Sequence, residues 1–537
     1  MNHDIAALDP NFSIDDLLAP GVDVDLTNCD REPIHLSGQI QPHGVVLAVG
    51  GADLVVRAVS ENSPQLLAVA APDLLGVALA QALGPAADAA VRVALRDLRG
   101  SGQAPVHTET AHGQSIDLTW FRTGDLVVLE IEPAAPMDLA TMATLFETAN
   151  QAMQTTSSAT DVASICRATA AEIRNLTGYD RVMVYRFHPD WHGEVVAEER
   201  AEGLGSLLGL HYPSTDIPRQ ARKLFLLNPL RMIGDVEYRP ATLIARPGAE
   251  VLDLSLSRLR SVSPIHLEYL RNMGVQATLT ISLSRGSRLW GMVACHHYSP
   301  RFIGSQLRSS LRVFAQAAGT QIVAQEDLDH RTYAATLADD EVKVLARMSR
   351  AESLSVGLTA GEPSGLELAG ADGMITRIDG RTATAGQVPA SDAVALLLAT
   401  LSSGSEGAEL VCHDLPGRLP ELSPHAQHAA GVIAMSLSSN YEDFICWFRG
   451  EWTHTVTWAG NPDKTVTVPV TGGRADPGQL RLTPRRSFEA WEETVHGQCR
   501  PWSAAEVDTA RHLAHAVPDL QVARAQSHVA HLSLIHI

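Results

Sequence analysis

Residues 276–299, QATLTISLSRGSRLWGMVACHHYS, set the fold class of the middle of the chain. The apolar runs QATLTISLS and RLWGMVACHHYS flank the turn-like tripeptide RGS, as in an antiparallel hairpin. Two runs upstream, DRVMVYRF at 180–187 and GEVVAEER at 193–200, predict neighbouring strands. Helical periodicity at 138–178 completes an α+β domain built on an antiparallel sheet.

The same pattern extends to both sides of this domain. Between about 40 and 132, short apolar runs alternate with one Ala-rich stretch, which predicts an antiparallel sheet with helices on one side. Residues 304–350 contain no proline and carry apolar residues at helical spacing, so they predict one long helix or two nearly continuous ones. A third α+β segment follows at about 350–500. Ser503 and Glu506 have the capping-box spacing of a final helix. Pro518 is expected to interrupt that helix or to start a new turn.

The composition excludes several classes of protein and several kinds of partner. The chain has 537 residues, 45% of them hydrophobic and 19% charged, enough for roughly three or four domains. A formal net charge of −20 disfavours nucleic acid and anionic membrane surfaces. No apolar run is long enough to span a membrane, and the N-terminus lacks a signal-peptide pattern, so we expect a cytoplasmic protein. Six scattered cysteines without a CxxC pair predict neither a disulfide framework nor a structural zinc site.

One candidate site lies in LGLHYPSTDIPRQARKLF, residues 208–225. Asp216 stands between Pro213 and Pro218, which hold the backbone extended or turned and leave its carbonyl groups without local donors. A ligand rich in N–H groups would supply those donors. The alternative interpretation is a surface loop in which Asp216 caps the helix that begins after Pro218.

A second candidate site lies in RLRSVSPIHLEYLRNMGV, residues 258–275. Its Arg, Ser and His side chains suit the recognition of a carboxylate, and Arg231 could serve a second one. The alternative is a helix cap followed by an amphipathic helix with Tyr269 in the core. In the strand 290–299, His296 and His297 point to opposite faces, so they make a poor metal site and one of them faces inward.

Cys29 differs from the other cysteines because polar residues surround it, in NCDREPIHLSGQIQPHG at 28–44. A thiol, carboxylate-binding side chains, free backbone acceptors and several tyrosines together suit a flat, conjugated ligand with acidic arms. With these motifs, residues 20–520 resemble the photosensory core of a bacteriophytochrome, a biliverdin-binding phytochrome. The motifs that carry the resemblance are the 28–44 stretch, PSTDIP, SPIHLEYLRNMGV, WGMVACHH, WFRGEW with WAGNP (447–462), and PRRSF (484–488).

The resemblance implies three consecutive antiparallel-sheet domains, PAS, GAF and PHY, joined by long helices. It also implies an N-terminal figure-of-eight knot with Ile40 at its core and a PHY extension called the tongue. The expected divisions are a flexible lead at 1–20, the PAS domain with the chromophore cysteine at 21–135, the GAF domain at 136–320, the PHY domain at 321–520 with its tongue at about 444–490, and the start of an output helix at 521–537, whose last residues, 532–537, are expected to be a non-native tail.

The resemblance also implies a covalent chromophore, biliverdin IXα, in thioether linkage to Cys29. The backbone carbonyl of Asp216 accepts from the pyrrole N–H groups, and His266 lies beside the central rings. Arg231 and Arg260 bind the propionates, assisted by Ser263, Thr278 and Thr280, and His296 bonds the D-ring carbonyl. The remaining chromophore-binding positions are Ile217, Pro218, the cage residues Tyr185, Tyr212 and Tyr269, and Phe225, where many relatives have tyrosine. No metal ligand and no catalytic residue are expected.

In the family, red light isomerises the chromophore from Z to E and the tongue refolds from hairpin to helix. By resemblance, Arg485 pairs with Asp216 in the red-absorbing state and Ser487 replaces it in the far-red state. Gly450 departs from the proline that relatives usually have in the tongue. A parallel homodimer would pass the signal to an output module, commonly a histidine kinase acting on a response regulator; no kinase motif occurs in these 537 residues.

Two other functions remain open on the sequence. A GAF-type sensor would bind a small ligand without photochemistry. An enzyme would use Cys29 as a nucleophile, with His35 or His43 as its base.

Overall fold

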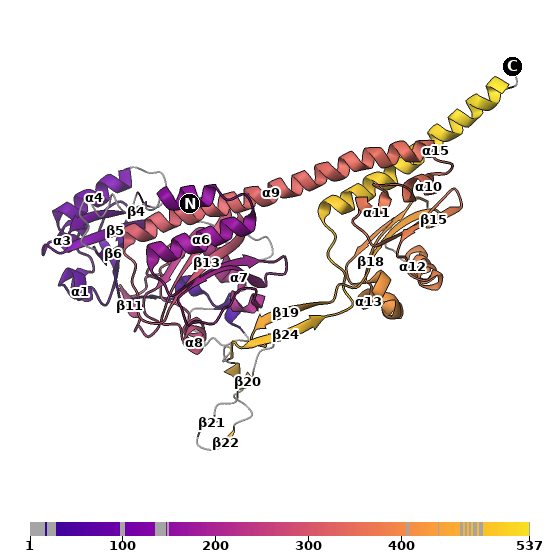
Figure 1. The fold of residues 1–537 in the computed structure, drawn as a ribbon. Coiled ribbons are helices and arrows are strands. Elements are labelled where there is room, and N and C mark those ends of the chain that lie inside the picture. The colour runs from indigo at the N-terminus through magenta and orange to yellow at the C-terminus, as the bar shows by residue number, and fades with distance from the viewer. Residues whose placement is uncertain are drawn as a thin grey trace. The chain divides into compact units, whose positions relative to one another are not determined.

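The computed structural model describes residues 17–18, 28–96, 102–134, 147, 150–403, 408–438, 440–461, 466–467, 470–471, 474–475, 481–482 and 487–535 (Figure 1). Most of the expected lead at 1–20, Arg485 and the last two residues of the chain lie outside these ranges. Two compact units make up the chain, residues 1–325 with 457–491 and residues 326–456 with 492–537. Three large, mostly antiparallel sheets with helices packed on them confirm the expected α+β class.

The N-terminal sheet has the strand order β1-β11-β3-β2-β6-β5-β4. Its elements are β1 (Gln39–Ile40), β2 (Val45–Gly50), β3 (Val56–Ser60), α1 (Pro64–Leu67), α2 (Ala71–Leu74), α3 (Leu79–Leu83), α4 (Pro85–Arg96), β4 (Gly102–Glu109), β5 (Ser115–Thr123), β6 (Leu126–Pro133) and β11 (Ala241–Ala245). Val45, Leu47 and Val49 of β2 pack on the side of the helices, as the predicted one-sided cover requires. β11 comes from the middle of the chain, so this sheet is not built from one continuous segment.

Residues 28–44, called the lead from here on, run between two other segments of the same unit. It begins with two short 3₁₀ turns, η3 (Cys29–Arg31) and η4 (Ile34–Leu36). Ile40, which is fully buried, pairs with Ala241 on one side and with Arg260 on the other. Backbone bonds from Gln41 N to Leu259 O (2.7 Å) and from Ser261 N to Gln39 O (2.9 Å) extend the second pairing.

The middle sheet has the order β10-β12-β13-β7-β8-β9, continued by β19 and β24. Its strands and helices are α6 (Val162–Thr177), β7 (Arg181–Phe187), β8 (Gly193–Arg200), β9 (His211–Tyr212), η5 (Ser214–Asp216), α7 (Arg219–Leu227), β10 (Leu230–Ile233), α8 (Pro264–Asn272), β12 (Ala277–Arg285), β13 (Arg288–His297), β19 (His454–Ala459) and β24 (Ala490–Val495). The predicted hairpin is confirmed, because β12 and β13 pair antiparallel from Ala277↔His297 to Arg285↔Arg288.

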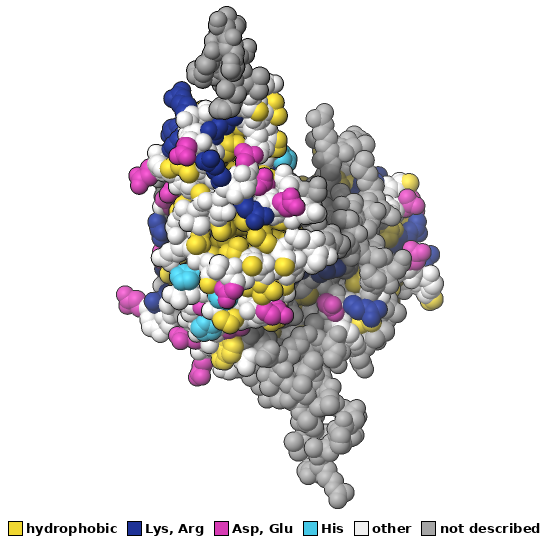
Figure 2. Space-filling view, turned by 90° about the vertical axis from the view of Figure 1, so that its right-hand side faces the viewer, with side chains coloured by type: hydrophobic (Ala, Val, Ile, Leu, Met, Phe, Trp, Pro, Cys, Tyr) yellow, Lys and Arg dark blue, Asp and Glu magenta, His cyan; other side chains and the backbone are white. Residues whose placement is uncertain are grey.

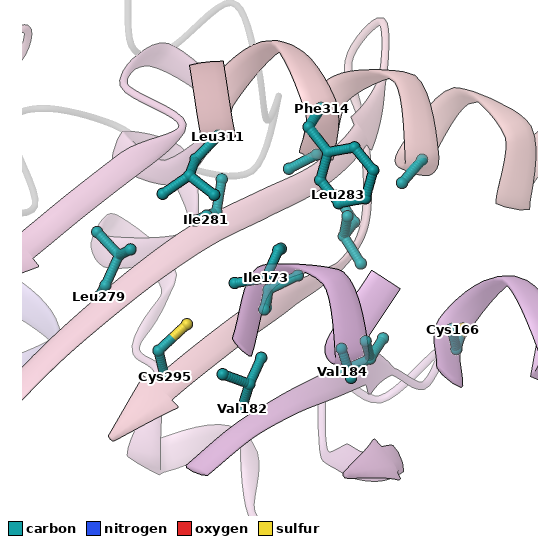
Figure 3. Close-up of a cluster of buried hydrophobic side chains, with 14 of the residues drawn as sticks. Cys166, Ile173, Val182, Val184, Leu279, Ile281, Leu283, Cys295, Leu311 and Phe314 are labelled. Atoms are coloured by element: carbon teal, nitrogen blue, oxygen red, sulfur yellow. The ribbon is translucent and has the colours of Figure 1, made fainter. Parts of the chain in front are cut away.

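Alternation along these strands divides the middle sheet into two faces. Val182 and Val184 of β7 point toward α6 and α9 (Ser305–Arg350), in the core drawn in Figure 3. The other side chains of that core include Ile173 of α6, Leu279, Ile281 and Leu283 of β12, Cys295 of β13, and Leu311 and Phe314 of α9. Met183 and Tyr185, between the valines, belong to a separate buried cluster on the opposite face. That opposite face is the one that builds the site described below.

The C-terminal sheet has the order β15-β14-β18-β17-β16. Its elements are α10 (Leu354–Thr359), α11 (Gly365–Leu368), β14 (Gly373–Ile378), β15 (Arg381–Gly386), α12 (Ser391–Ser403), β16 (Glu409–Cys412), α13 (Leu415–Arg418), η6 (Pro420–His425), α14 (Ala426–Ala429), β17 (Gly431–Ser436), β18 (Phe444–Arg449) and α15 (Ala504–Ile535). β18 pairs with β14 and β17, so residues 444–449 of the expected tongue lie in this sheet, and the chain leaves the sheet at Gly450. Beyond it lie two small ladders, β20 (Val466–Thr467) with β23 (Arg481–Leu482) and β21 (Val470–Thr471) with β22 (Arg474–Ala475).

The predictions for the long helices are confirmed except at Pro518. α9 runs without interruption from Ser305 to Arg350. The capping box is present, because Ser503 N donates to Glu506 Oε2 (2.6 Å) and Glu506 N donates to Ser503 Oγ (3.2 Å). The expected interruption at Pro518 is wrong, since α15 continues through it. Burial of the flanking Leu513 and Val517 outweighs the single hydrogen bond that proline removes.

Charged side chains of both signs are interspersed over the described surface of the face in Figure 2, and hydrophobic side chains gather near its middle. On this face the acidic groups are therefore spread rather than concentrated. In the part of the chain that the structure describes, none of the helices is both long enough and apolar enough to cross a membrane.

Candidate functional site

A cavity of about 280 Å³ lies against the face of the middle sheet opposite α6 and α9. Strand alternation supplies its floor, with Tyr185 from β7, Thr278 and Thr280 from β12, and His296 from β13. The helices α7 and α8 and the turn η5 supply its other walls. All fourteen residues that the sequence predicted around the ligand, apart from the thiol, line this cavity: Tyr185, Tyr212, Asp216, Ile217, Pro218, Phe225, Arg231, Arg260, Ser263, His266, Tyr269, Thr278, Thr280 and His296.

Two arginines bring positive charge to one wall. Arg231 donates to the backbone carbonyls of Arg258 (3.4 Å), Ser261 (3.2 Å) and Arg260. Arg260 is buried and donates weakly to the carbonyl of Leu254 (3.5 Å). Burial lowers the pKa of both guanidinium groups, and that of Arg260 is lowered further by Arg231. Neither forms an ion pair with a carboxylate among the described residues, so the wall can accept acidic groups from a ligand.

Two histidines at the cavity have lowered pKa values. Burial lowers the pKa of His296 to about 3, and Arg181 and His266 lower it in the same direction. Burial and then Arg231 lower the pKa of His266 to about 4, although the ring keeps accessible surface because it borders the cavity. The Nδ1 atom of His296 is buried and has no hydrogen-bond partner within the described ranges. The prediction that one of the adjacent pair faces inward is confirmed, because His296 lines the cavity.

Tyrosines and one carboxylate form another part of the cavity. Tyr269 of α8 donates to Asp216 Oδ2 (3.0 Å), and the rings of Tyr185 and Tyr212 lie 5.9 Å apart. A Cβ at Gly193 would lie 1.8 Å from Tyr185 Cζ, so glycine at that point of β8 makes room for the ring. The alternative interpretation of Asp216 as a helix cap is wrong, because Pro218 is the N-cap of α7 and no side chain caps this helix.

The lead also reaches the cavity. The turn η3, which contains Cys29, lies against α7. Glu32 and Ile34 line the cavity, and burial raises the pKa of Glu32, opposed by a hydrogen bond with Ser263. The side chain of Cys29 is outside the part that the structure describes, so its attachment role stays a prediction.

Sequence reasoning missed several lining residues. Met183 and Met292 could have been found, because each lies two positions from another cavity residue on its strand. Glu32, Gln220 and Asn228 carried no such signal, since packing between distant segments brings them to the cavity.

The segment that leaves the C-terminal sheet returns to this unit. Trp458 of β19 pairs with His211 of β9, and the ring of Phe488 meets Tyr269 edge-on at 5.3 Å. Ser487, adjacent to Phe488, is exposed. Arg485 lies outside the described residues, so its pairing with Asp216 stays a prediction.

Comparison with known proteins agrees with this architecture. The family models described as PAS fold, GAF domain and Phytochrome region match residues 29–134, 161–322 and 338–526. Cyanobacterial phytochrome B of a Nostoc strain is 35% identical over 519 residues, covering 94% of this chain and 67% of its own. A Pseudomonas aeruginosa bacteriophytochrome is 37% identical over 505 residues, covering 91% and 66%. The Stigmatella aurantiaca phytochrome photosensory core superposes with a TM-score of 0.77 at 38% identity, covering 93% of this chain and 99% of that one.

A cavity-bearing GAF domain that follows a PAS fold and precedes a phytochrome region in the chain is the domain order of a modular photosensory core. The chain belongs to the phytochrome family, as a bacteriophytochrome-type PAS–GAF–PHY core. It is a red/far-red photoreceptor with a bilin chromophore, and a GAF-type sensor without photochemistry is not favoured. The chain spans about two thirds of the length of the Nostoc and Pseudomonas relatives.

Proposed function

We propose that the bilin is biliverdin IXα and that Cys29 binds it through a thioether. The observation that carries the proposal is a cavity with two arginines that lack carboxylate partners and a buried histidine nitrogen that lacks any partner in the described structure. Biliverdin has two propionates and a terminal lactam carbonyl, which match these unsatisfied groups.

The lining residues divide by chemistry. Arg231 and Arg260 bind the propionates, with Ser263, Thr278 and Thr280 as neutral hydrogen-bond partners. The backbone carbonyl of Asp216 accepts from ring N–H groups. Ile217 and Pro218 keep the backbone after it extended, so that this carbonyl stays available to the ligand. Phe225 offers only an apolar contact.

The remaining lining residues surround the part of the ligand that moves. When bound, the bilin supplies red-light absorption and the Z-to-E rotation of its D ring. Neutral His296 donates a hydrogen bond to the ring carbonyl, and His266 beside it holds or releases a proton at its ring nitrogen. Tyr185, Tyr212 and Tyr269 exclude water and repack around the ring.

Asp216 links the cavity to the tongue. Its carboxylate accepts from Tyr269, and we place Arg485 and Ser487 as alternative partners in the red- and far-red-absorbing states. Exchange between two partners biases a bistable segment, here the residues from Gly450 to about 490. The edge contact between Phe488 and Tyr269 supports this arrangement, because it brings the residue next to Ser487 to the same helix as the Asp216 donor.

We also propose a route by which the signal leaves the core. A parallel homodimer would pass the tongue's change through α9 and α15 to a C-terminal histidine kinase and its response regulator in the cytoplasm. Domains at 21–135, 136–320 and 321–520 and an N-terminal knot around Ile40 complete the proposed organisation. The double pairing of Ile40 supports the knot.

Co-expression with a haem oxygenase tests the proposal. We expect a coloured protein that absorbs red light, changes its spectrum reversibly, and keeps its pigment in denaturing gel electrophoresis. Cys29→Ala should lose the covalent band, whereas Cys166→Ala, at a buried cysteine of the opposite core, should retain it. A covalent band in the Cys29→Ala variant would refute the attachment, and identical spectra in darkness and after illumination would refute the photochemistry.

A further inference from the structure

Three histidines outside the cavity come together beside β9. His188 follows β7, His192 directly precedes β8, and His211 begins β9. One ring nitrogen from each lies within 4.8 Å of the other two. The rings of His188 and His192 stack at 4.2 Å, and the ring of His211 lies 5.1 Å from that of His192. Two separate segments of the chain therefore gather three imidazoles around one point.

Two carboxylates orient two of these rings. Glu194 Oε2 lies 3.0 Å from His188 Nε2, and Asp190 Oδ1 lies 2.6 Å from His192 Nδ1. An ionised carboxylate can only accept, so the ring nitrogen facing it donates; a neutral imidazole held in this way keeps a lone pair on its other nitrogen. This carboxylate–histidine arrangement is the one that fixes the tautomer and orientation of imidazoles bound to a metal.

The third ring has an unsatisfied atom. The Nδ1 of His211 is buried and has no hydrogen-bond partner among the described residues. Leaving a buried polar nitrogen unpaired costs free energy, which a bound ion would recover.

We propose that His188, His192 and His211 bind one zinc ion, with water as the fourth ligand and with Asp190 and Glu194 as outer partners. Three imidazoles and an open position form a common zinc ligand set. Ligand nitrogens around tetrahedral zinc stand ~3.3 Å apart, so the three must close by on the order of 1 Å. None of the three lines the bilin cavity described above, so this site is independent of the proposed chromophore chemistry.

The ion would act on the strand that returns from the C-terminal sheet. Trp458 of β19 packs edge-on against His192 (5.8 Å) and His211 (5.9 Å), and its backbone pairs with His211. Holding these imidazoles in place should therefore stabilise the β9–β19 pairing. Amide hydrogen exchange in residues 457–459 should slow when zinc is added.

The test is calorimetric titration of the holoprotein, without any affinity tag, with zinc chloride. We expect one zinc ion per chain and at least tenfold weaker binding in His188→Ala and in His211→Ala. His330→Ala removes an exposed histidine on α9 and should leave the affinity unchanged. Repeating the titration with apoprotein separates binding at the histidines from binding to bilin nitrogens.

X-ray absorption at the zinc edge provides the second measurement. We expect a first shell of nitrogen and oxygen at ~2.0–2.1 Å without sulfur. Absence of zinc binding, unchanged affinity in the His188→Ala/His211→Ala double variant, or sulfur in the first shell would each overturn the proposal. If circular dichroism shows that His211→Ala is unfolded, His188→Asn, in the turn after β7, takes its place in the comparison.

Discussion

The buried ion pair between Arg449 and Glu506 ties the end of β18 to the start of α15. Arg449 Nη2 lies 2.8 Å from Glu506 Oε1, and both side chains are almost fully buried. Arg449 also donates to the carbonyls of Gly370 (2.9 Å), Arg500 (3.0 Å) and Pro501 (2.9 Å). The perturbation is Arg449→Met, which keeps an apolar stem of similar length and removes every one of these donors.

The expected cost follows from what is left behind. Glu506 keeps hydrogen bonds from Tyr333 Oη (3.0 Å) and Ser503 N (2.6 Å) but loses its buried cation. The cation that stays, Arg500 Nη2 at 3.9 Å from Glu506 Oε1, belongs to a largely exposed side chain, so water screens it. Removing one member of a buried pair costs about 3–5 kcal/mol, because an uncompensated charge stays in the interior. Replacing both members by apolar residues is often close to neutral, so Arg449→Met/Glu506→Met should recover most of the loss.

Native-state hydrogen exchange measured by mass spectrometry reports this free energy locally. In Arg449→Met, we expect peptides covering β18 and the first turns of α15 to exchange faster. The free energy of opening of these peptides should fall by about 3–5 kcal/mol. Peptides from α6, in the other unit, serve as the internal control. Equal loss of protection in the single and double variants would show that lost packing, rather than the stranded carboxylate, sets the cost.

Three further predictions concern the cavity and the tongue. The pKa of His296 is about 3 in the fold and ~6.5 in the unfolded chain. The neutral ring therefore contributes its full stability to the apoprotein above pH 6.5, and up to roughly 5 kcal/mol is lost as the pH falls through 3. His296→Gln should flatten this part of the stability–pH curve, and an unchanged curve would contradict the prediction. Tyr269→Phe removes the hydrogen bond to Asp216 and keeps the edge contact with Phe488. The free energy of unfolding of the apoprotein in urea should fall by about 1 kcal/mol. An unchanged value would show that this hydrogen bond does not contribute to stability. Gly450→Pro removes the N–H that donates to Asp372 Oδ2 (2.9 Å) and places a Cβ 2.4 Å from the backbone oxygen of Gln427. The free energy of unfolding of the C-terminal unit, measured by thermal melting, should therefore fall by ~1–3 kcal/mol. Gly205→Ala, where a Cβ meets open space, should have no effect.

The local sequence pattern was sufficient to predict features within a single strand or helix, such as the direction of side chains and the extent of the helix. Alternation along β7 separates Val184, in the α6–α9 core, from Tyr185, in the cavity, and the same period brings His296 inward. The unbroken apolar spacing of 304–350 gave α9 within one residue of its start. These features depend on neighbours in the sequence, so the sequence shows them directly.

Features that depend on distant packing escaped prediction. β11 joins the N-terminal sheet because it pairs with both β1 and β3, although the residues on either side of it belong to the middle of the chain. The histidine cluster needs the β7–β8 turn and β9 to meet, and His211 lies nineteen positions after His192 without a spacing that signals a metal. Pro518 was misjudged for the same reason, since its tolerance depends on the core that Leu513 and Val517 enter.

The lead and the arginine wall form one hydrogen-bonded structure, and this limits where the thiol can be. Backbone bonds join Gln39 and Gln41 to the residues on either side of Arg260, whose guanidinium lines the cavity. Glu32, farther up the lead, lines the same cavity. Three residues span at most ~10 Å of chain, so position 29 is held within that distance of a cavity residue whatever the conformation of the residues before it. If the proposed thioether forms, a thiol placed there is confined near the chromophore beforehand, and its effective concentration exceeds that of the buried cysteines of the opposite core.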